Sequence, residues 1–310
     1  MKIVVSLPEK DNEFQVLQAA QAHTTAKRLR VEVVVVHAEN SAVVQIQQLF
    51  KALRADPRPD AIVVEPVTTS GLESVLRKAA LSGIGSAILN STLADIASLR
   101  ASFPGVALFA VSSDQVEIGR LQGRQIRALL PSGGTVLYLH GPHTALPAQE
   151  RFRGVQEAIE GAGVRLIVLD GQWSEDSAEG AVRRWLRLKT SEALAVDLVA
   201  AQDDSMARGA CRGIEASPEV AARGARIPYL GIDGVPEVGQ HLVDQGKLTA
   251  TVVMPSNTGP AIEHLARWSR SGVLPPELLT LPVRPYPELR AMVARRAVRP
   301  SPEAAGLLTR

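Results

Sequence analysis

Short runs of β-branched residues alternate with stretches of helical periodicity along most of this 310-residue chain. Residues 31–36 form a continuous apolar run, which is typical of a strand covered on both faces. In residues 41–55, apolar side chains such as Val43, Ile46 and Phe50 recur on one helix face. This alternation favours right-handed βαβ units and parallel sheets, and therefore predicts an α/β fold.

The number of expected strands indicates more than one sheet. Apart from residues 2–7 and 31–36, strands are expected near residues 61–64, 85–89, 107–111, 134–139, 165–170, 196–201, 227–232 and 249–253. A sheet averages about five or six strands, so two sheets fit better than one. Residues 90–104 lack a clear pattern, which suggests a boundary between the two sheets there. The helix expected at 113–130 carries Gly119 and Gly123 on one face, which predicts a close approach to its sheet.

Composition supports a folded protein and gives no general sign of nucleic-acid binding. Hydrophobic residues make up 45% of the chain and charged residues 21%, a balance that argues against disorder. The net charge is only +2, although residues 284–310 hold six Arg and two Glu. A solvated terminal helix is the simpler interpretation of this basic tail, and a partner site is the alternative. The single cysteine, Cys211, excludes an intramolecular disulfide and a cysteine-built zinc site.

Motifs for catalysis, cofactor binding and DNA binding are missing from the sequence. There is no G-x-G-x-x-G after a strand, no P-loop, no G-x-S-x-G elbow and no helix-turn-helix before the first strand. His140 and His143 have a spacing that suits two metal ligands, but Gly141 and Pro142 indicate a loop, and no third ligand lies nearby. No apolar segment reaches the roughly 18 to 20 residues that span a bilayer. We therefore expect no enzymatic activity, cofactor, metal, nucleic acid or membrane insertion, with an α/β enzyme as a remaining alternative.

Polar and aromatic side chains gather where the expected strands end. In open parallel sheets, ligands bind beyond the carboxyl ends of the strands. The residues at or just beyond those ends are Ser6, Asn90, Asp114, Arg151, Trp173, Asp203, Asp204, Asp233 and Met254, with Phe14 in the first turn of the first helix. Carboxylates, amides and an arginine can hold several hydroxyls, and Phe14 and Trp173 can stack on a sugar ring. Each residue also has a structural alternative: helix capping for Asp and Asn, an ion pair for Arg151, a loop anchor for Trp173.

Five short motifs occur in order over about residues 1–285. They are Val5-Ser6-Leu7 with Asn12-Glu13-Phe14, ERFRGV at 150–155, AQDDSMA at 201–207, GIDGVP at 231–236 and GKLTATV at 246–252. Together they resemble those of type I periplasmic sugar-binding proteins, the ribose- and galactose-binding group. That group shares its fold with the effector domains of lactose-repressor-type regulators.

The resemblance implies two Rossmann-like α/β lobes with parallel sheets, joined by a three-crossing hinge. The crossings are expected near residues 112–114, 253–256 and 283–285. The N-terminal lobe would then comprise residues 1–113 plus 255–283, and the C-terminal lobe 114–254 plus 284–310.

The resemblance also implies a set of ligand-binding residues. The family's pocket positions map onto Ser6, Asn12, Phe14 and Asn90 in the N-terminal lobe, and onto Arg151, Trp173, Asp203, Asp233 and Met254 beyond it. Four departures from the ribose-binding pattern stand out: Gln15 for a second Phe, Asn90-Ser91 for Asp-Arg, Asp203 for Asn, and Met254 for a polar residue, usually Gln. The N-terminal lobe thereby loses an acceptor carboxylate, a cationic fork and an aromatic wall. We therefore expect a ligand other than ribose: another sugar, a polyol or a different small polar molecule.

The implied function is binding without chemistry, with closure of the two lobes around a monosaccharide or related polyol. Such a protein would be the solute receptor of an ABC-type sugar importer, with an ABC permease as partner. The alternative is a cytoplasmic ligand-sensing module of a signalling or regulatory system, with a sensor protein as partner and no role in transport. A periplasmic location is expected if a signal peptide was removed, and a cytoplasmic one if Met1 is the native start.

Overall fold

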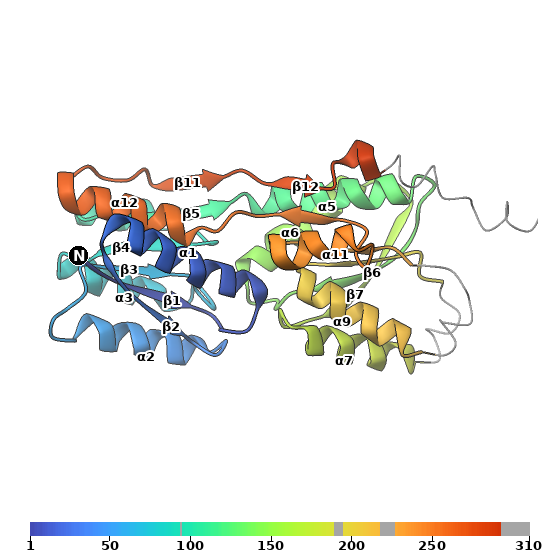
Figure 1. Cartoon of the computed structure of the whole chain (residues 1–310), viewed down its shortest axis with the longest axis horizontal. Helices are drawn as coiled ribbons and strands as arrows, with labels where there is room; N and C mark the ends of the chain where they lie inside the picture. The colour runs from blue at the N-terminus through green and yellow to red at the C-terminus, as the bar shows by residue number, and fades with distance from the viewer. Residues whose placement is uncertain (94, 189–194, 218–226, 293–310) are drawn as a thin grey trace, which may run out of the picture. The chain divides into compact units, whose positions relative to one another are not determined.

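The computed structural model describes residues 1–93, 95–188, 195–217 and 227–292, which form two compact α/β units (Figure 1). Unit 1 comprises Met1–Gln115, His143–Gln149 and Pro255–Pro282. Unit 2 comprises the described residues of Val116–Pro142, Glu150–Met254 and 283–292. Each unit has its own sheet and its own hydrophobic cores.

Unit 1 is built on a six-stranded sheet in which every strand pair is parallel, with the order β11-β5-β4-β3-β1-β2. The strands are β1 (Lys2–Leu7), β2 (Glu32–His37), β3 (Ala61–Val64), β4 (Gly85–Leu89), β5 (Leu108–Ser113) and β11 (Leu278–Leu281). The helices are α1 (Glu13–Leu29), α2 (Ala42–Leu53), α3 (Leu72–Leu81), α4 (Ile96–Ser102) and α12 (Thr258–Ser271).

The two faces of this sheet are covered by different helices. Side chains alternate along each strand, so Ile3 and Val5 of β1 pack under α1 and α12, whereas Val4 packs with α2, α3 and α4. Helices α1 and α12 lie side by side although they are far apart in the sequence (Figure 1). Strands buried on both faces explain the continuous apolar runs in the sequence.

Unit 2 contains a four-stranded parallel sheet with the order β7-β6-β8-β9. Its strands are β6 (Gly134–His140), β7 (Val164–Asp170), β8 (Leu198–Ala201) and β9 (Tyr229–Leu230), and an antiparallel pair joins β10 (Thr251–Val253) to β12 (Arg284–Tyr286). Its helices are α7 (Glu175–Leu186), α9 (Asp204–Glu215), the π-helix η1 (Pro236–Gln240) and α11 (His241–Asp244), together with α5 (Gln115–Leu129) and α6 (Leu146–Ile159), whose first residues are counted with unit 1. One face of the sheet packs against α5 and α6, and the other against α7 and α9.

The predicted two-lobed α/β fold with parallel sheets is confirmed, whereas three details of the sequence analysis are wrong. Residues 90–104 are not a boundary, because α4 lies there and β5 pairs with β4 inside unit 1. Strands β11 and β12 were not expected; β11 is a short, half-exposed edge strand without a buried apolar run. Gly119 and Gly123 pack against α6 rather than against the sheet.

Two further sequence expectations concern the ends of the chain and the membrane. Most of the basic tail, residues 293–310, lies outside the described residues. Within the part of the chain that the structure describes, no helix has both the length and the apolar character required to cross a bilayer.

Candidate functional site

The predicted site residues lie at the carboxyl ends of the parallel strands in both units. In unit 1, Ser6 is near the end of β1 and Asn90 directly follows β4. In unit 2, Trp173, Asp203, Asp233 and Met254 follow β7, β8, β9 and β10, and Arg151 lies in the second turn of α6 after β6. Each sheet therefore presents its own cluster of polar groups at one edge, as expected for open parallel sheets.

Glu65, directly after β3, is the centre of the unit 1 cluster. Its Oε1 accepts hydrogen bonds from Gln15 Nε2 at 3.1 Å and from Asn90 Nδ2 at 3.0 Å, and its Oε2 accepts one from Gln18 Nε2 at 3.1 Å. The residue is only 8% exposed. The three amide groups replace part of the hydration that the carboxylate loses on burial.

Ser6 and Asn90 belong to this same network. Gln45 Nε2 donates to Ser6 Oγ at 3.2 Å and to the backbone oxygen of Glu65 at 2.8 Å. Asn90 Oδ1 accepts a hydrogen bond from Asn257 Nδ2 at 2.7 Å. Asn90 is therefore bonded to the Glu65 carboxylate, and Ser6 is linked to the Glu65 backbone through Gln45. The sequence did not indicate Glu65 as a site residue, although it directly follows an expected strand.

Asn12 and Phe14 lie at the start of α1. Asn12 Oδ1 accepts hydrogen bonds from the backbone N–H groups of Phe14 at 2.9 Å and of Gln15 at 3.3 Å, so Asn12 is the N-cap of the helix. Asp203 acts in the same way on α9, where its Oδ1 accepts the Met206 N–H at 2.5 Å. The capping alternative is thus realised for both residues, and it fixes where their side chains lie.

Arg151 is the centre of the unit 2 cluster and is only 5% exposed. Its Nη1 donates to the backbone oxygen of Gln202 at 2.6 Å and lies 3.9 Å from Asp233 Oδ1. Its Nη2 contacts Met254 Sδ at 3.2 Å, and its guanidinium carbon lies 5.5 Å from the Trp173 ring centroid. The structure therefore brings three other predicted residues, Trp173, Asp233 and Met254, together around this buried cation.

Close packing of α5 against α6 sets the position of Arg151. A Cβ on Gly119 of α5 would collide with the backbone oxygen of Arg151, and a Cβ on Gly154 of α6 would collide with the backbone oxygen of Val116. The two glycines therefore let the helices approach each other at their backbones. The arginine is carried on a helix whose distance from its neighbour is fixed by the absence of these side chains.

The Trp173 ring lies over Gly141, where a Cβ would collide with the ring. Gly141 is itself held by Gln202, whose Oε1 accepts the Gly141 N–H at 2.8 Å and whose Nε2 donates to the Tyr138 hydroxyl at 3.0 Å. Burial raises the pKa of Tyr138, and the hydrogen bond with Gln202 and the charge of Arg151 oppose that rise. Gln202, part of the AQDDSMA motif, thus holds Arg151 through its backbone oxygen and Gly141, over which the Trp173 ring lies, through its side chain.

Three of the predicted site residues have a left-handed backbone. Their φ values are 53° for Asn90, 57° for Trp173 and 101° for Asp233. Residues other than glycine seldom adopt positive φ, and such strain collects at ligand-binding and catalytic sites. In this protein the three strained residues all lie in the loops that follow strands, where the polar clusters are.

The arrangement suits recognition of a polar molecule better than a metal. No group of three or more His, Cys, Asp or Glu residues within the described parts of the chain could hold a metal ion. Amides, carboxylates and a guanidinium offer both donors and acceptors, and an aromatic face lies beside them.

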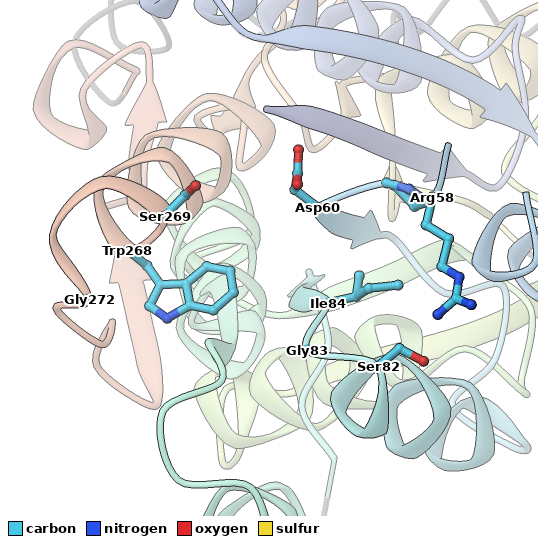
Figure 2. Close-up of a pocket in the computed structure, with 9 residues that line it drawn as sticks. Arg58, Asp60, Ser82, Gly83, Ile84, Trp268, Ser269 and Gly272 are labelled. Carbon is cyan, nitrogen blue, oxygen red and sulfur yellow. The ribbon is translucent and has the colours of Figure 1, made fainter. Parts of the chain in front are cut away.

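Unit 1 also has a shallow pocket of about 430 Å³ (Figure 2), which does not lie at the carboxyl ends of the strands. It is lined near the amino ends of β3 and β4, by Asp60 before β3 and by Gly83 and Ile84 before β4, and by Trp268 of α12. Figure 2 shows the Trp268 ring and the Arg58 side chain flanking it. None of the predicted site residues lines this pocket.

Comparison with known proteins identifies related chains. A D-ribose/D-allose-binding protein of Pseudomonas aeruginosa is 28% identical over 193 residues, which cover 62% of this chain and 57% of that protein. A galactofuranose-binding protein of Escherichia coli (strain K12) is 27% identical over 227 residues, 72% of this chain and 68% of that protein. The crystal structure of an ABC transporter periplasmic solute binding protein from Actinobacillus succinogenes, with bound D-allose, is similar with a TM-score of 0.80. That structure is 21% identical and shares the fold, with 94% of this chain and 98% of the other covered.

The match to a family model is broader than any single motif. The model for the periplasmic binding protein domain matches residues 3–258, which include every predicted site residue. This chain therefore belongs to the periplasmic binding protein domain family and has its type I fold of two α/β lobes.

Proposed function

We propose that this protein binds a monosaccharide or a related polyol without converting it, as the solute receptor of an ABC-type importer. The observation that carries the proposal is the buried Arg151, held at the carboxyl edge of the unit 2 sheet beside Asp233 and Trp173. The names of the related ribose-, allose- and galactofuranose-binding proteins support the same class of ligand.

The unit 2 cluster has the chemistry that hydroxyl groups require. The 3.9 Å between Arg151 Nη1 and Asp233 Oδ1 is longer than a hydrogen bond, and a ligand hydroxyl there can accept from the guanidinium while it donates to the carboxylate. The Trp173 ring supplies an apolar face for the C–H side of a sugar. Hydrogen bonds to charged groups are roughly twice as strong as those between neutral groups.

The unit 1 cluster complements these groups with acceptors. Asn90 replaces a carboxylate of the ribose-binding pattern, and Glu65 supplies a carboxylate to the same network 3.0 Å from the Asn90 amide. The sequence had suggested a loss of acceptor charge in this lobe, and Glu65 offsets that loss. We propose that Ser6, Asn12, Phe14 and Asn90 face the ligand from this side, supported by Glu65.

Binding in such a protein is coupled to closure of the lobes. We propose that the two units are the lobes expected from the sequence, with hinge segments near residues 112–114, 253–256 and 283–285. Closure is favoured only by the difference between the ligand's affinities for the closed and open forms. Hinge segments take up such a rotation through a few backbone dihedrals.

The periplasmic family favours an exported protein with an ABC permease as partner. A sensing module without transport is the alternative function. A membrane-flotation assay with a candidate ABC permease distinguishes the two: ligand-dependent association supports transport.

The direct test is a thermal-shift screen followed by calorimetry. D-Ribose, D-allose, D-galactose, L-arabinose and myo-inositol are suitable probes, with small dicarboxylic acids as a comparison class. A ligand present at a hundredfold excess over its dissociation constant stabilises the folded state by about 2.7 kcal/mol. Stabilisation by a sugar or polyol, without turnover, supports the proposal; stabilisation by acids alone, or turnover of the sugar, contradicts it.

A further inference from the structure

Asp204, one of the polar residues that follow the expected strands, is a buried carboxylate that the family resemblance does not place among the ligand-binding residues. Its Oδ1 accepts a hydrogen bond from Thr251 Oγ1 at 2.7 Å, and its Oδ2 accepts one from the backbone N–H of Gly234 at 2.8 Å. The residue lies in the first turn of α9, where the helix dipole favours a negative charge. Asp204 thus connects α9, the loop after β9 and β10.

The loop after β9 carries Asp233 in a strained conformation. The N–H of Asp233 donates to the backbone oxygen of Val252 at 2.9 Å, and the Asp233 oxygen accepts the Met254 N–H at 3.0 Å. These two backbone hydrogen bonds hold the loop against β10. Within the loop, Asp233 has a positive φ of 101°. A conformation of this kind persists only when its surroundings determine it.

The loop wraps closely around the Asp204 carboxylate. A Cβ on Gly231 would collide with Asp204 Oδ1, and a Cβ on Gly239 would collide with Asp204 Oδ2. Gly234, which donates to the carboxylate, also accepts a hydrogen bond from Gln240 Nε2 at 2.7 Å through its backbone oxygen. The loop, through Gly231 and Gly234, and η1, through Gly239, therefore both lie against the carboxylate.

We propose that Asp204 is a positioning residue, which holds residues 233–234 so that the Asp233 carboxylate stays beside Arg151; its effect on affinity rests on the proposed function. The carboxylate suits this role because its two oxygens face two donors. An asparagine keeps one acceptor for the Gly234 N–H, and its amide can donate to Thr251 Oγ1 if that hydroxyl turns. Alanine removes both hydrogen bonds and leaves the buried Gly234 N–H without its acceptor.

The test compares Asp204→Ala and Asp204→Asn with the unaltered chain. The hydrogen-exchange rate of the Gly234 amide, measured by NMR without any ligand, reports whether its hydrogen bond to Asp204 is intact. Calorimetry with the sugar or polyol that gives the largest thermal shift reports its effect on binding. We expect Asp204→Ala to speed Gly234 exchange and weaken binding, each by at least about tenfold, and Asp204→Asn to restore most of both.

The matched control is Asp244→Asn, which alters a carboxylate of the same unit that accepts the Tyr286 hydroxyl at 2.7 Å. It should leave Gly234 exchange and affinity unchanged. If Asp204→Ala does not fold, Gly239→Ala displaces the carboxylate instead and should give the same two effects. A lower melting temperature with unchanged Gly234 exchange overturns the proposal. If no sugar or polyol binds the unaltered chain, the proposed function fails, while Gly234 exchange still decides whether Asp204 holds the loop.

Discussion

The guanidinium of Arg151 lies over the Trp173 ring, with 5.5 Å between its central carbon and the ring centroid. The two residues come from different strand-end segments, α6 and the loop after β7. Such a contact is worth about 0.5–1 kcal/mol at an exposed site and more when it is desolvated; here Arg151 is buried and Trp173 is half-buried. The contact also fixes the directions in which the guanidinium N–H groups can donate to a ligand.

Removal of Arg151 or Asp233 should weaken ligand binding more than it destabilises the fold. We expect Arg151→Ala and Asp233→Ala each to lower affinity by about 2 kcal/mol or more, because partner groups stay buried without a hydrogen bond. Calorimetry with the best sugar or polyol measures the effect. Arg153→Ala, on an exposed position of the same helix, is the control and should bind normally. Unchanged affinity in both site variants would remove this cluster from the binding site.

Trp173 allows the ring and the backbone to be tested separately. Its φ of 57° is strained for most residues other than glycine. We therefore expect Trp173→Gly to have a free energy of unfolding about 1 kcal/mol larger than that of Trp173→Ala, and a correspondingly higher melting temperature. Both variants lack the ring, and we expect both to bind the ligand more weakly than the unaltered chain. Differential scanning calorimetry gives the stability, and titration gives the affinity. Equal stability of the two variants would show that the backbone at this position is not strained.

Glu65 should matter for both stability and binding in unit 1. Glu65→Gln replaces a carboxylate that accepts three amide hydrogen bonds by a side chain with one acceptor oxygen. We expect a loss of about 1–3 kcal/mol of stability in urea unfolding, together with weaker binding. Glu73→Gln, which alters an exposed ion pair with Arg77, should cost less than about 1 kcal/mol. If both variants have the same unfolding midpoint, the Glu65 network contributes no more than a surface pair.

The extent to which the sequence predicts this site differs between residues. Arg151, Trp173, Asp233 and Met254 form one cluster because parallel strands end at a common edge, and this follows from strand positions alone. Glu65 obeys the same rule, yet no motif marked it, and its importance depends on amides supplied by distant segments.

Backbone strain and helix spacing were harder to predict. The positive φ of Trp173 follows from tertiary contacts, since tryptophan has no local preference for such a conformation. Aspartate adopts positive φ more often than most residues, but that tendency alone does not single out Asp233 among the aspartates of the chain. The glycines of α5 correctly indicated a close approach, but to the helix α6 and not to the sheet. A sequence pattern shows which face of a helix is packed closely, and it does not show which element packs against that face.

The close packing of α5 against α6 should affect ligand binding, although Gly119 is not a ligand-binding residue. Gly119→Ala places a methyl group against the backbone of Arg151, and we expect it to cost about 1–3 kcal/mol of stability and to lower affinity through displacement of the arginine. Gly180→Ala on α7 meets only the flexible end of Arg184 and should be neutral or stabilising. Thermal unfolding and titration of both variants provide the comparison. Normal binding by Gly119→Ala would show that Arg151 does not depend on this spacing.

His264 should make unit 1 less stable in mild acid. Partial burial beside Phe109 lowers its pKa, Arg267 lowers it further, and Glu263 opposes the shift. In the unfolded chain a histidine titrates near about pH 6.5, so below that pH the unfolded state binds more protons than the folded state. The stability is therefore fully present above about pH 6.5 and is lost as the pH falls through the folded-state pKa. Melting temperatures from about pH 8 to pH 5 should fall less in His264→Gln than in the unaltered chain; identical pH profiles would contradict this assignment.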